Sequence, residues 1–154
     1  MSKILIVAEH ANGKLNASTA KCLSAAKQMG ASAIEVAVFA ADPGAVAAQA
    51  AQLDGVTRVR TVANPANANA MAAVLAPQVV ALAADYTHVL GPSTTYGKDL
   101  MPCVAALLGE AMVSDIMKVH GAHRFERPIY AGNAIITVEC PAARKVVATA
   151  LILG

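Results

Sequence analysis

Aromatic and charged residues are scarce in this sequence of 154 residues, and each shortage argues against a class of protein. Tryptophan is absent, aromatic residues make up 3% of the chain, and charged residues make up 14% with a formal net charge of +2. Nucleic-acid-binding proteins gather Lys and Arg on one face and often stack bases on aromatic rings. The sequence therefore predicts a protein without a nucleic-acid partner.

Cysteines are also few: Cys22, Cys103 and Cys140 are far apart, odd in number and outside any CxxC pair. This pattern favours a reducing, cytoplasmic compartment. The apolar run over residues 4–8 is too short for a signal-peptide core and has no cleavage site after it.

Long apolar runs are missing as well, because the longest, residues 70–84, is broken by Pro77 and Gln78. A membrane-spanning helix needs about 20 mostly apolar residues, so we expect no membrane partner. The positive mean hydropathy of +0.52 comes from alanine, which occurs 36 times and suits closely packed helices. The length predicts a single α/β domain over residues 1–154.

Short β-type runs alternate with Ala-rich windows over the first two thirds of the chain. The runs cover residues 4–8, 34–40, 56–62 and 86–90, and the windows cover about 16–29, 43–53, the stretch that follows residue 67 or 69, and 97–108. Alternation of this kind predicts a Rossmann-like parallel sheet with helices on both faces, here over residues 3–112. Residues 9–13 are expected to form a polar loop.

Helix boundaries are marked by capping residues. Asn16 is expected to cap the first helix, with Gly30 at its C-terminal end, and Asp42 with Pro43 opens the second. Asn67 or Asn69 is expected to start the third helix, which Pro77 should kink or split.

The last third, residues 113–153, is rich in β-branched residues and is expected to contain antiparallel strands at 116–120, 125–130, 134–140 and 146–152. Gly132-Asn133 fits either a two-residue hairpin turn or a bulge within one long strand, and we favour the bulge. Gly132 should take a positive φ or admit another backbone close to it.

Catalytic motifs are not found. No GxGxxG follows the first strand, and GPSTTYGKD over residues 91–99 fails as a P-loop. Five residues separate its glycines, and Asp99 stands where a Ser or Thr must hold magnesium. The stretch fits a turn in which Ser93 or Thr94 caps a helix, although such a helix N-terminus could still receive an anion.

The remaining reactive side chains give no constellation either. His88 is expected to be a hydrogen-bonded core histidine, and His120 with His123 to lie on the surface rather than bind a metal. Cys103 is expected to be a small buried residue. We therefore predict no catalytic or metal-binding residue, and a protein that is not an enzyme.

Four stretches together carry a family resemblance: IVAEH (6–10), GPSTTYGKDLMP (91–102), VSDI (113–116) and RPIYAGNA (127–134). In this order and spacing the chain, from about residue 3 to 150, resembles the N-terminal part of the electron transfer flavoprotein alpha subunit. The match covers about half of that family's chain and leaves out the half that holds FAD.

The resemblance implies a scaffold domain within a heterodimer. In this family electrons from dehydrogenases pass through FAD, which a separate flavin domain holds, and AMP is expected in the partner beta subunit. No cofactor is expected in this chain itself. The motif positions are then expected to have structural or interface roles: Gly91, Gly97, Lys98, Ser114, Asp115, Arg127, Tyr130, Gly132 and Asn133.

Two positions depart from the family pattern. Cys103 stands where the family commonly has a basic residue, and the ending after Ala148 lacks the family's usual Arg and linker. We expect the chain to stop at a domain boundary rather than to be a naturally truncated product. We also expect the isolated domain to self-associate through residues 113–153, whose apolar end at 150–153 should be exposed.

A different function also remains open from the sequence. A stand-alone adenine-nucleotide binder of the universal-stress type would bind its ligand beyond the carboxyl ends of the strands, at the switch point of the sheet.

Overall fold

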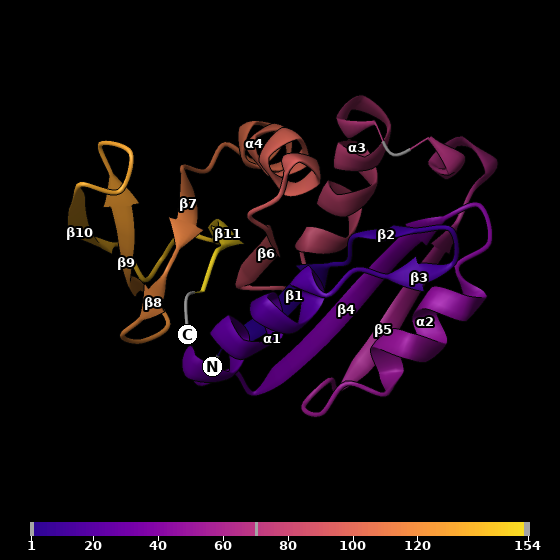
Figure 1. The fold of residues 1–154 in the computed structure, drawn as a ribbon, viewed down its shortest axis with the longest axis horizontal. Coiled ribbons are helices and arrows are strands. Elements are labelled where there is room, and N and C mark those ends of the chain that lie inside the picture. Colours follow the sequence, from indigo (N-terminus) through magenta and orange to yellow (C-terminus); the bar gives the residue numbers. More distant parts are fainter. Residues whose placement is uncertain (1, 70, 153–154) are drawn as a thin grey trace.

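A six-stranded sheet lies at the centre of the computed structural model, which describes residues 2–69 and 71–152 (Figure 1). All of its strand pairs are parallel, and the order is β5-β4-β1-β6-β11-β7. The strands are β1 (Lys3–Val7), β4 (Ala33–Ala40), β5 (Arg58–Ala63), β6 (His88–Pro92), β7 (Met112–Ile116) and β11 (Val146–Ala150). The predicted Rossmann-like parallel sheet is confirmed.

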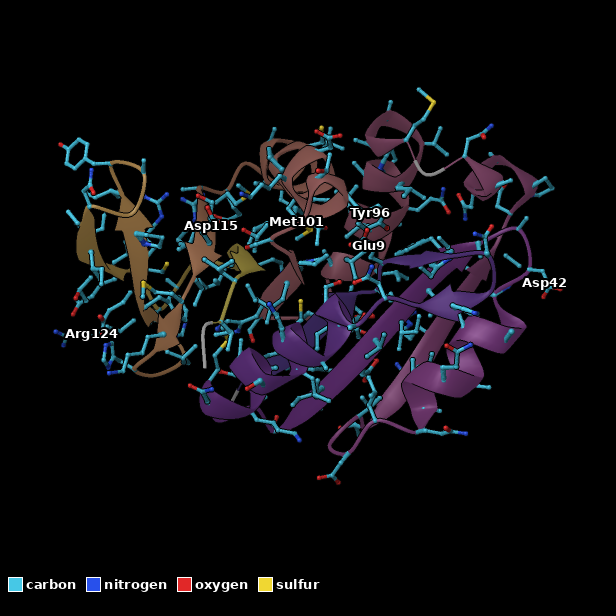
Figure 2. All side chains as sticks on the ribbon, in the orientation of Figure 1. Glu9, Asp42, Tyr96, Met101, Asp115 and Arg124 are labelled. Carbon is cyan, nitrogen blue, oxygen red and sulfur yellow. The ribbon has the colours of Figure 1, made fainter. Side chains whose placement is uncertain are left out.

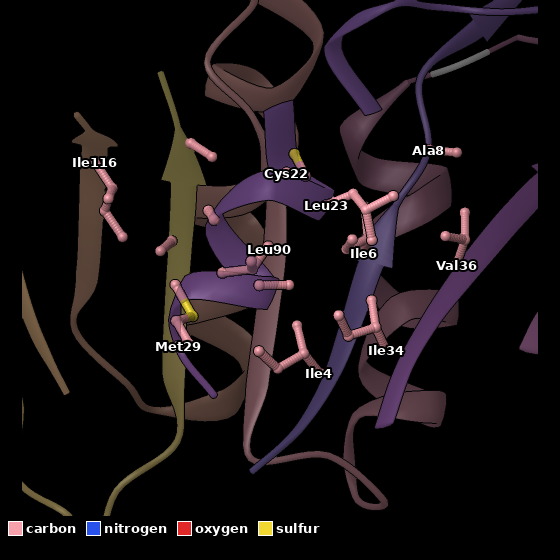
Figure 3. Close-up of a cluster of buried hydrophobic side chains, with 14 of the residues drawn as sticks. Ile4, Ile6, Ala8, Cys22, Leu23, Met29, Ile34, Val36, Leu90 and Ile116 are labelled. Carbon is pink, nitrogen blue, oxygen red and sulfur yellow. The ribbon is translucent and has the colours of Figure 1, made fainter. Parts of the chain in front are cut away.

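Helices cover both faces of this sheet, as predicted. Helices α1 (Ser18–Gln28) and α2 (Gly44–Ala51) pack on one face, and α3 (Ala72–Ala83) and α4 (Thr95–Leu108) pack on the other. Alternate residues of a strand point to opposite faces. Ile4 and Ile6 of β1 therefore join the α1 core (Figure 3), whereas Leu5 joins the α4 core. Within the described residues, none of these helices combines the length and the apolar character that crossing a bilayer requires.

The N-cap residues of α1 and α2 are Ala17 and Pro43, one position after the predicted Asn16 and Asp42, and neither makes a side-chain capping bond. The predicted residues instead bond to backbone N–H groups two positions further on. Asn16 Oδ1 accepts a hydrogen bond from the Ser18 N–H at 2.9 Å, and Gly30 takes a φ of +72° just beyond α1. Asp42 Oδ1 accepts from the Gly44 N–H at 3.4 Å at the start of α2. These bonds use backbone groups that a helix end leaves unpaired.

The expected polar loop at residues 9–13 is partly a hairpin. Strands β2 (His10–Ala11) and β3 (Lys14–Leu15) pair in antiparallel fashion around Asn12 and Gly13, whose φ values are +53° and +73°. Two consecutive positive φ values suit a tight hairpin turn. The sequence prediction missed it because each strand is only two residues long.

The predicted start of the third helix was wrong. Asn64 caps a short 3-10 helix, η1 (Pro65–Ala68), and α3 begins only at Ala72. Asn67 is buried instead and exchanges two amide hydrogen bonds with Gln78, of 2.9 and 2.6 Å. Pro77 lies within one continuous helix, so the predicted split does not occur.

A second, three-stranded antiparallel sheet stands beside β7, in the order β10-β9-β8 (Figure 1). It contains β8 (Lys118–Val119), β9 (Arg124–Ile129) and β10 (Ala134–Glu139), which confirms antiparallel strands in the last third. However, the parallel sheet does not end at residue 112, because β7 and β11 belong to it. The expected strand 116–120 is divided: residue 116 ends β7 and residue 118 begins β8.

The connection between β9 and β10 is a hairpin and not the favoured bulge. Residues 130–133 form a four-residue loop, since Ile129 pairs with Ala134. Tyr130, Ala131 and Gly132 all have positive φ, of +52°, +53° and +86°. The prediction of a positive φ at Gly132 is confirmed, and open space surrounds the position where its Cβ would lie.

Candidate functional site

The switch point of the sheet lies between β1 and β6, whose following helices cover opposite faces. Glu9 follows β1 at this point (Figure 2), and its Oε1 accepts a hydrogen bond of 2.7 Å from the Thr94 hydroxyl. Tyr96 donates to the Ala8 carbonyl oxygen at 3.5 Å beside it. The carboxylate of Glu9 therefore occupies the edge where this kind of fold usually holds an anionic ligand.

Two glycines allow α4 to approach β6. A Cβ on Gly97 would lie 1.7 Å from the Pro92 carbonyl oxygen, and a Cβ on Gly91 would lie 2.6 Å from the Met101 side chain. Thr94 Oγ1 accepts from the Gly97 N–H at 3.3 Å, which confirms the predicted cap. Close packing thus accounts for both glycines without a phosphate loop.

Four of the sequence-predicted residues meet where α4, β7 and β9 come together. Lys98 Nζ lies 3.5 Å from Asp115 Oδ1. Arg127 donates from Nε to the Ser114 carbonyl oxygen at 2.8 Å and from its terminal nitrogen to Ser114 Oγ at 3.0 Å. These contacts attach α4 and the antiparallel sheet to β7.

Asp115 adopts a φ of +56°, which is uncommon for a residue with a side chain. Its N–H donates to Thr149 Oγ1 at 2.8 Å, so β11 holds this turn of β7 in place. Sequence reasoning missed Thr149, which lies 34 residues further on within an apolar strand. The sequence of β11 gives no sign that distinguishes Thr149 from an ordinary β-branched strand residue.

The other three predicted residues, Tyr130, Gly132 and Asn133, lie apart from this group at the tip of the β9–β10 hairpin. Tyr130 is 77% exposed, and Ile135 in β10 is 54% exposed. Ile136 is exposed too, and β10 is the outer strand of its sheet among the described residues. The hairpin is thus an apolar surface with an unpaired strand edge, and its role as an interface stays a prediction.

A buried carboxylate at the amino ends of the strands was missed by the sequence analysis. Glu35 accepts hydrogen bonds from Arg58 Nε and its terminal nitrogen, at 3.1 and 2.9 Å, and from the Tyr86 hydroxyl at 2.5 Å. Burial alone would raise the pKa of Glu35, but the hydrogen bonds from Tyr86 and Arg58 outweigh it and lower the pKa. This cluster connects β4 and β5 with the segment that leads into β6.

The cysteines and histidines are placed largely as predicted. Cys22 is buried, which raises the pKa of its thiol to about 12, and Cys103 is half-buried rather than fully buried. His88 is buried with both ring nitrogens in hydrogen bonds, as expected. His120 contacts Glu126. Across residues 2–69 and 71–152, no three His, Cys, Asp or Glu side chains come together as metal ligands would.

Fold and site define a Rossmann-like α/β protein in which Glu9 and Thr94 meet at the switch point of the sheet. The sequence profile of the electron transfer flavoprotein domain matches residues 4–151, and the chain belongs to this family. It is 44% identical over 144 residues to the electron transfer flavoprotein subunit alpha of Pseudomonas aeruginosa, covering 94% of this chain and 46% of the relative.

Other relatives agree. The subunit alpha of Paracoccus denitrificans is 41% identical, with 93% of this chain and 46% of the relative covered. The mitochondrial subunit alpha of Dictyostelium discoideum is 39% identical, with 90% and 41% covered. The chain thus spans about half the length of the curated relatives that it matches. Membership of this family does not favour the alternative of a universal-stress-type nucleotide binder.

Proposed function

We propose that this chain is the N-terminal scaffold domain of an electron transfer flavoprotein alpha subunit. In this role it supports the transfer of electrons from dehydrogenases through FAD, which a separate domain holds. The observation that carries the proposal is the match to alpha subunits over residues 4–151. The domain is then part of an electron carrier and has no catalytic site of its own.

The carboxyl edge supports a scaffold role rather than cofactor binding. Glu9 and its hydrogen bond from Thr94 occupy the switch point, where a pyrophosphate would meet a negative charge. This negative charge disfavours the phosphates of FAD or of a nucleotide at the switch point. We assign FAD to the flavin domain and AMP to the beta subunit.

The partners we propose are the beta subunit, in a heterodimer, and the flavin domain. The β9–β10 hairpin supports this assignment, because Tyr130, Ile135 and Ile136 expose apolar surface beside an unpaired strand edge. Three free cysteines, with no disulfide among the described residues, support a cytoplasmic location.

Reconstitution tests the proposal. The chain is purified alone and then mixed with a beta subunit and the flavin-binding half of an alpha subunit. We expect the chain alone to be colourless and the mixture to give a yellow complex that elutes as one species. Stoichiometric flavin on the chain alone, or failure to join the other two parts, would contradict it. Submillimolar binding of AMP by the chain in calorimetry would instead support the nucleotide-binding alternative.

A further inference from the structure

A buried histidine joins the two sheets of the molecule. His88 begins β6, between Ile4 of β1 and Val146 of β11, and is fully buried. Its Nε2 lies 2.6 Å from the carbonyl oxygen of Ala122, in the turn between β8 and β9. A carbonyl oxygen only accepts hydrogen bonds, so Nε2 carries the proton. Nδ1 lies 2.7 Å from the Thr87 hydroxyl, and both ring nitrogens are therefore used.

A second imidazole lies against the first. The ring centroid of His123, in the same turn, is 5.3 Å from that of His88. The His123 carbonyl oxygen accepts from the Cys140 N–H at 2.8 Å, which connects the turn to the end of β10. His88 of the central sheet thus contacts the turn that joins β8 and β9 of the antiparallel sheet.

The surroundings of His88 disfavour a positive charge. Two cations, Arg144 and Lys145, line a pocket of about 270 Å³ together with His123 and Thr87, the neighbours of His88 in space and in sequence. Lys145 Nζ donates to the Tyr86 carbonyl oxygen at 2.6 Å. The nearby carboxylate of Glu110 is already bonded to Arg144 at 2.8 Å.

The charged residues of β1 and α1, which pack against β6, are all lysines. Lys3 of β1 bonds to the Thr87 hydroxyl through its backbone, and Lys27 of α1 pairs with Asp54 at 3.8 Å. Burial lowers the pKa of His88, and a charge on His123 lowers it further, although the bond to Ala122 acts in the opposite direction.

We propose that His88 and His123 form an acid-sensitive latch that holds the β8–β9 turn on the central sheet at neutral pH and releases it in mild acid. The direction of the pH effect on opening follows from proton linkage. The released turn exposes His88, which then binds a proton near its ordinary pKa of about 6.5, whereas the closed form resists protonation. Opening is therefore favoured as pH falls below that value. Between pH 7.5 and 5.0 the open fraction rises by up to about 30-fold.

Hydrogen exchange tests the latch in the whole 154-residue chain. Rates are measured at pH 7.5 and 5.0, corrected for intrinsic exchange, and compared between residues 118–126 and strand β4. We expect the corrected exchange rate to rise at pH 5.0 in residues 118–126 and to stay unchanged in β4. His88→Gln keeps an N–H donor but cannot titrate, so the increase should disappear. His10→Gln is the matched control, because His10 Nε2 also bonds a backbone oxygen, that of Phe39, at 2.8 Å. It should keep the increase.

An equal increase in β4, no increase in residues 118–126, or the same increase in His88→Gln would overturn the proposal. Proton NMR of the histidine rings in the unmodified chain provides a second readout if His88→Gln fails to fold. We expect the His88 ring to titrate below about pH 6.5. Titration at or above that value would also overturn the latch.

Discussion

Single residues set the spacing and the charge balance of this molecule. Gly97 is required because helix α4 starts in contact with the backbone of Pro92, where a side chain has no room. Glu35 is required for a different reason, because it is a buried charge whose oxygens are held by hydrogen bonds from Arg58 and Tyr86. Each residue makes a specific and separable contribution to stability.

Replacing Gly97 by Ala places a Cβ 1.7 Å from the Pro92 carbonyl oxygen, so α4 must move away from β6. We expect the free energy of unfolding to fall by about 3 kcal/mol in urea denaturation. The matched control is Gly109→Ala at the end of the same helix, where φ is +68° and open space surrounds the new Cβ. Strain alone should cost about 1 kcal/mol there. Equal losses in the two variants would show that the close approach is unimportant.

Glu35→Gln removes the charge and keeps the shape. Because the pKa of Glu35 is lowered in the folded state, the charge stabilises the fold above its ordinary pKa of about 4.3. This stabilisation is lost as pH falls through the folded-state pKa. We expect the variant to be about 1–2 kcal/mol less stable at pH 7, with the difference closing in acid. Urea midpoints from pH 7 to 3 measure this, and a difference independent of pH would contradict it.

Secondary-structure elements differ in how far they follow from sequence. The runs at residues 4–8 and 34–40 predicted β1 and β4 because strands buried on both faces are almost continuously apolar, with Glu35 the exception in β4. The start of α3 was predicted wrongly at Asn67, because the amide of Asn67 pairs with Gln78. Capping rules do not include such a tertiary contact. The break between β7 and β8 was missed for the same kind of reason. Two residues before the break at residue 117, Asp115 has a positive φ, and its N–H is held by Thr149 from another strand.

Helix α3 contains a proline at a position where its missing N–H matters. Pro77 lies beyond the first turn, so it removes a backbone hydrogen bond from the helix. We expect Pro77→Ala to raise the free energy of unfolding by about 1–3 kcal/mol in urea denaturation. Pro65→Ala, at the start of η1, should give no such gain, because the first N–H groups of a helix have no partner within it. An unchanged or lower stability for Pro77→Ala would show that α3 needs the proline.

At the scale of the whole molecule, the β9–β10 hairpin exposes apolar side chains inside the predicted stretch of residues 113–153, although not at its end. The expected exposed end at residues 150–153 was wrong for Ala150, which is buried with the rest of β11, and residues 153 and 154 lie outside the described part. The pattern of apolar residues could not predict that β11 is buried, because a strand buried between two others and an exposed hydrophobic tail have the same apolar sequence pattern. Lys98, Ser114, Asp115 and Arg127 come together in the structure, and their interface role stays a prediction.

Self-association of the isolated chain stays a prediction, now assigned to the β9–β10 hairpin. We expect the double substitution Tyr130→Ser and Ile135→Lys to shift the chain to a monomer without changing its urea midpoint. Sizing chromatography with light scattering over a range of concentrations measures this. Leu107→Lys is the control, because Leu107 is 58% exposed on α4, outside the hairpin. A monomeric parent chain at high concentration would show that the hairpin alone does not drive association.

The position of β11 has a consequence for how the chain is made. During synthesis β7 emerges before β11, yet the two strands of the sheet that flank β11 are β6 and β7. Until residues 146–150 leave the ribosome, β6 and β7 each have an unpaired edge on that side. The antiparallel sheet, which lies between β7 and β11 in the sequence, has only local pairings and can form earlier. The central sheet of the nascent chain is therefore expected to stay incomplete until β11 pairs with β6 and β7. We expect the chain to be most prone to aggregation during that interval.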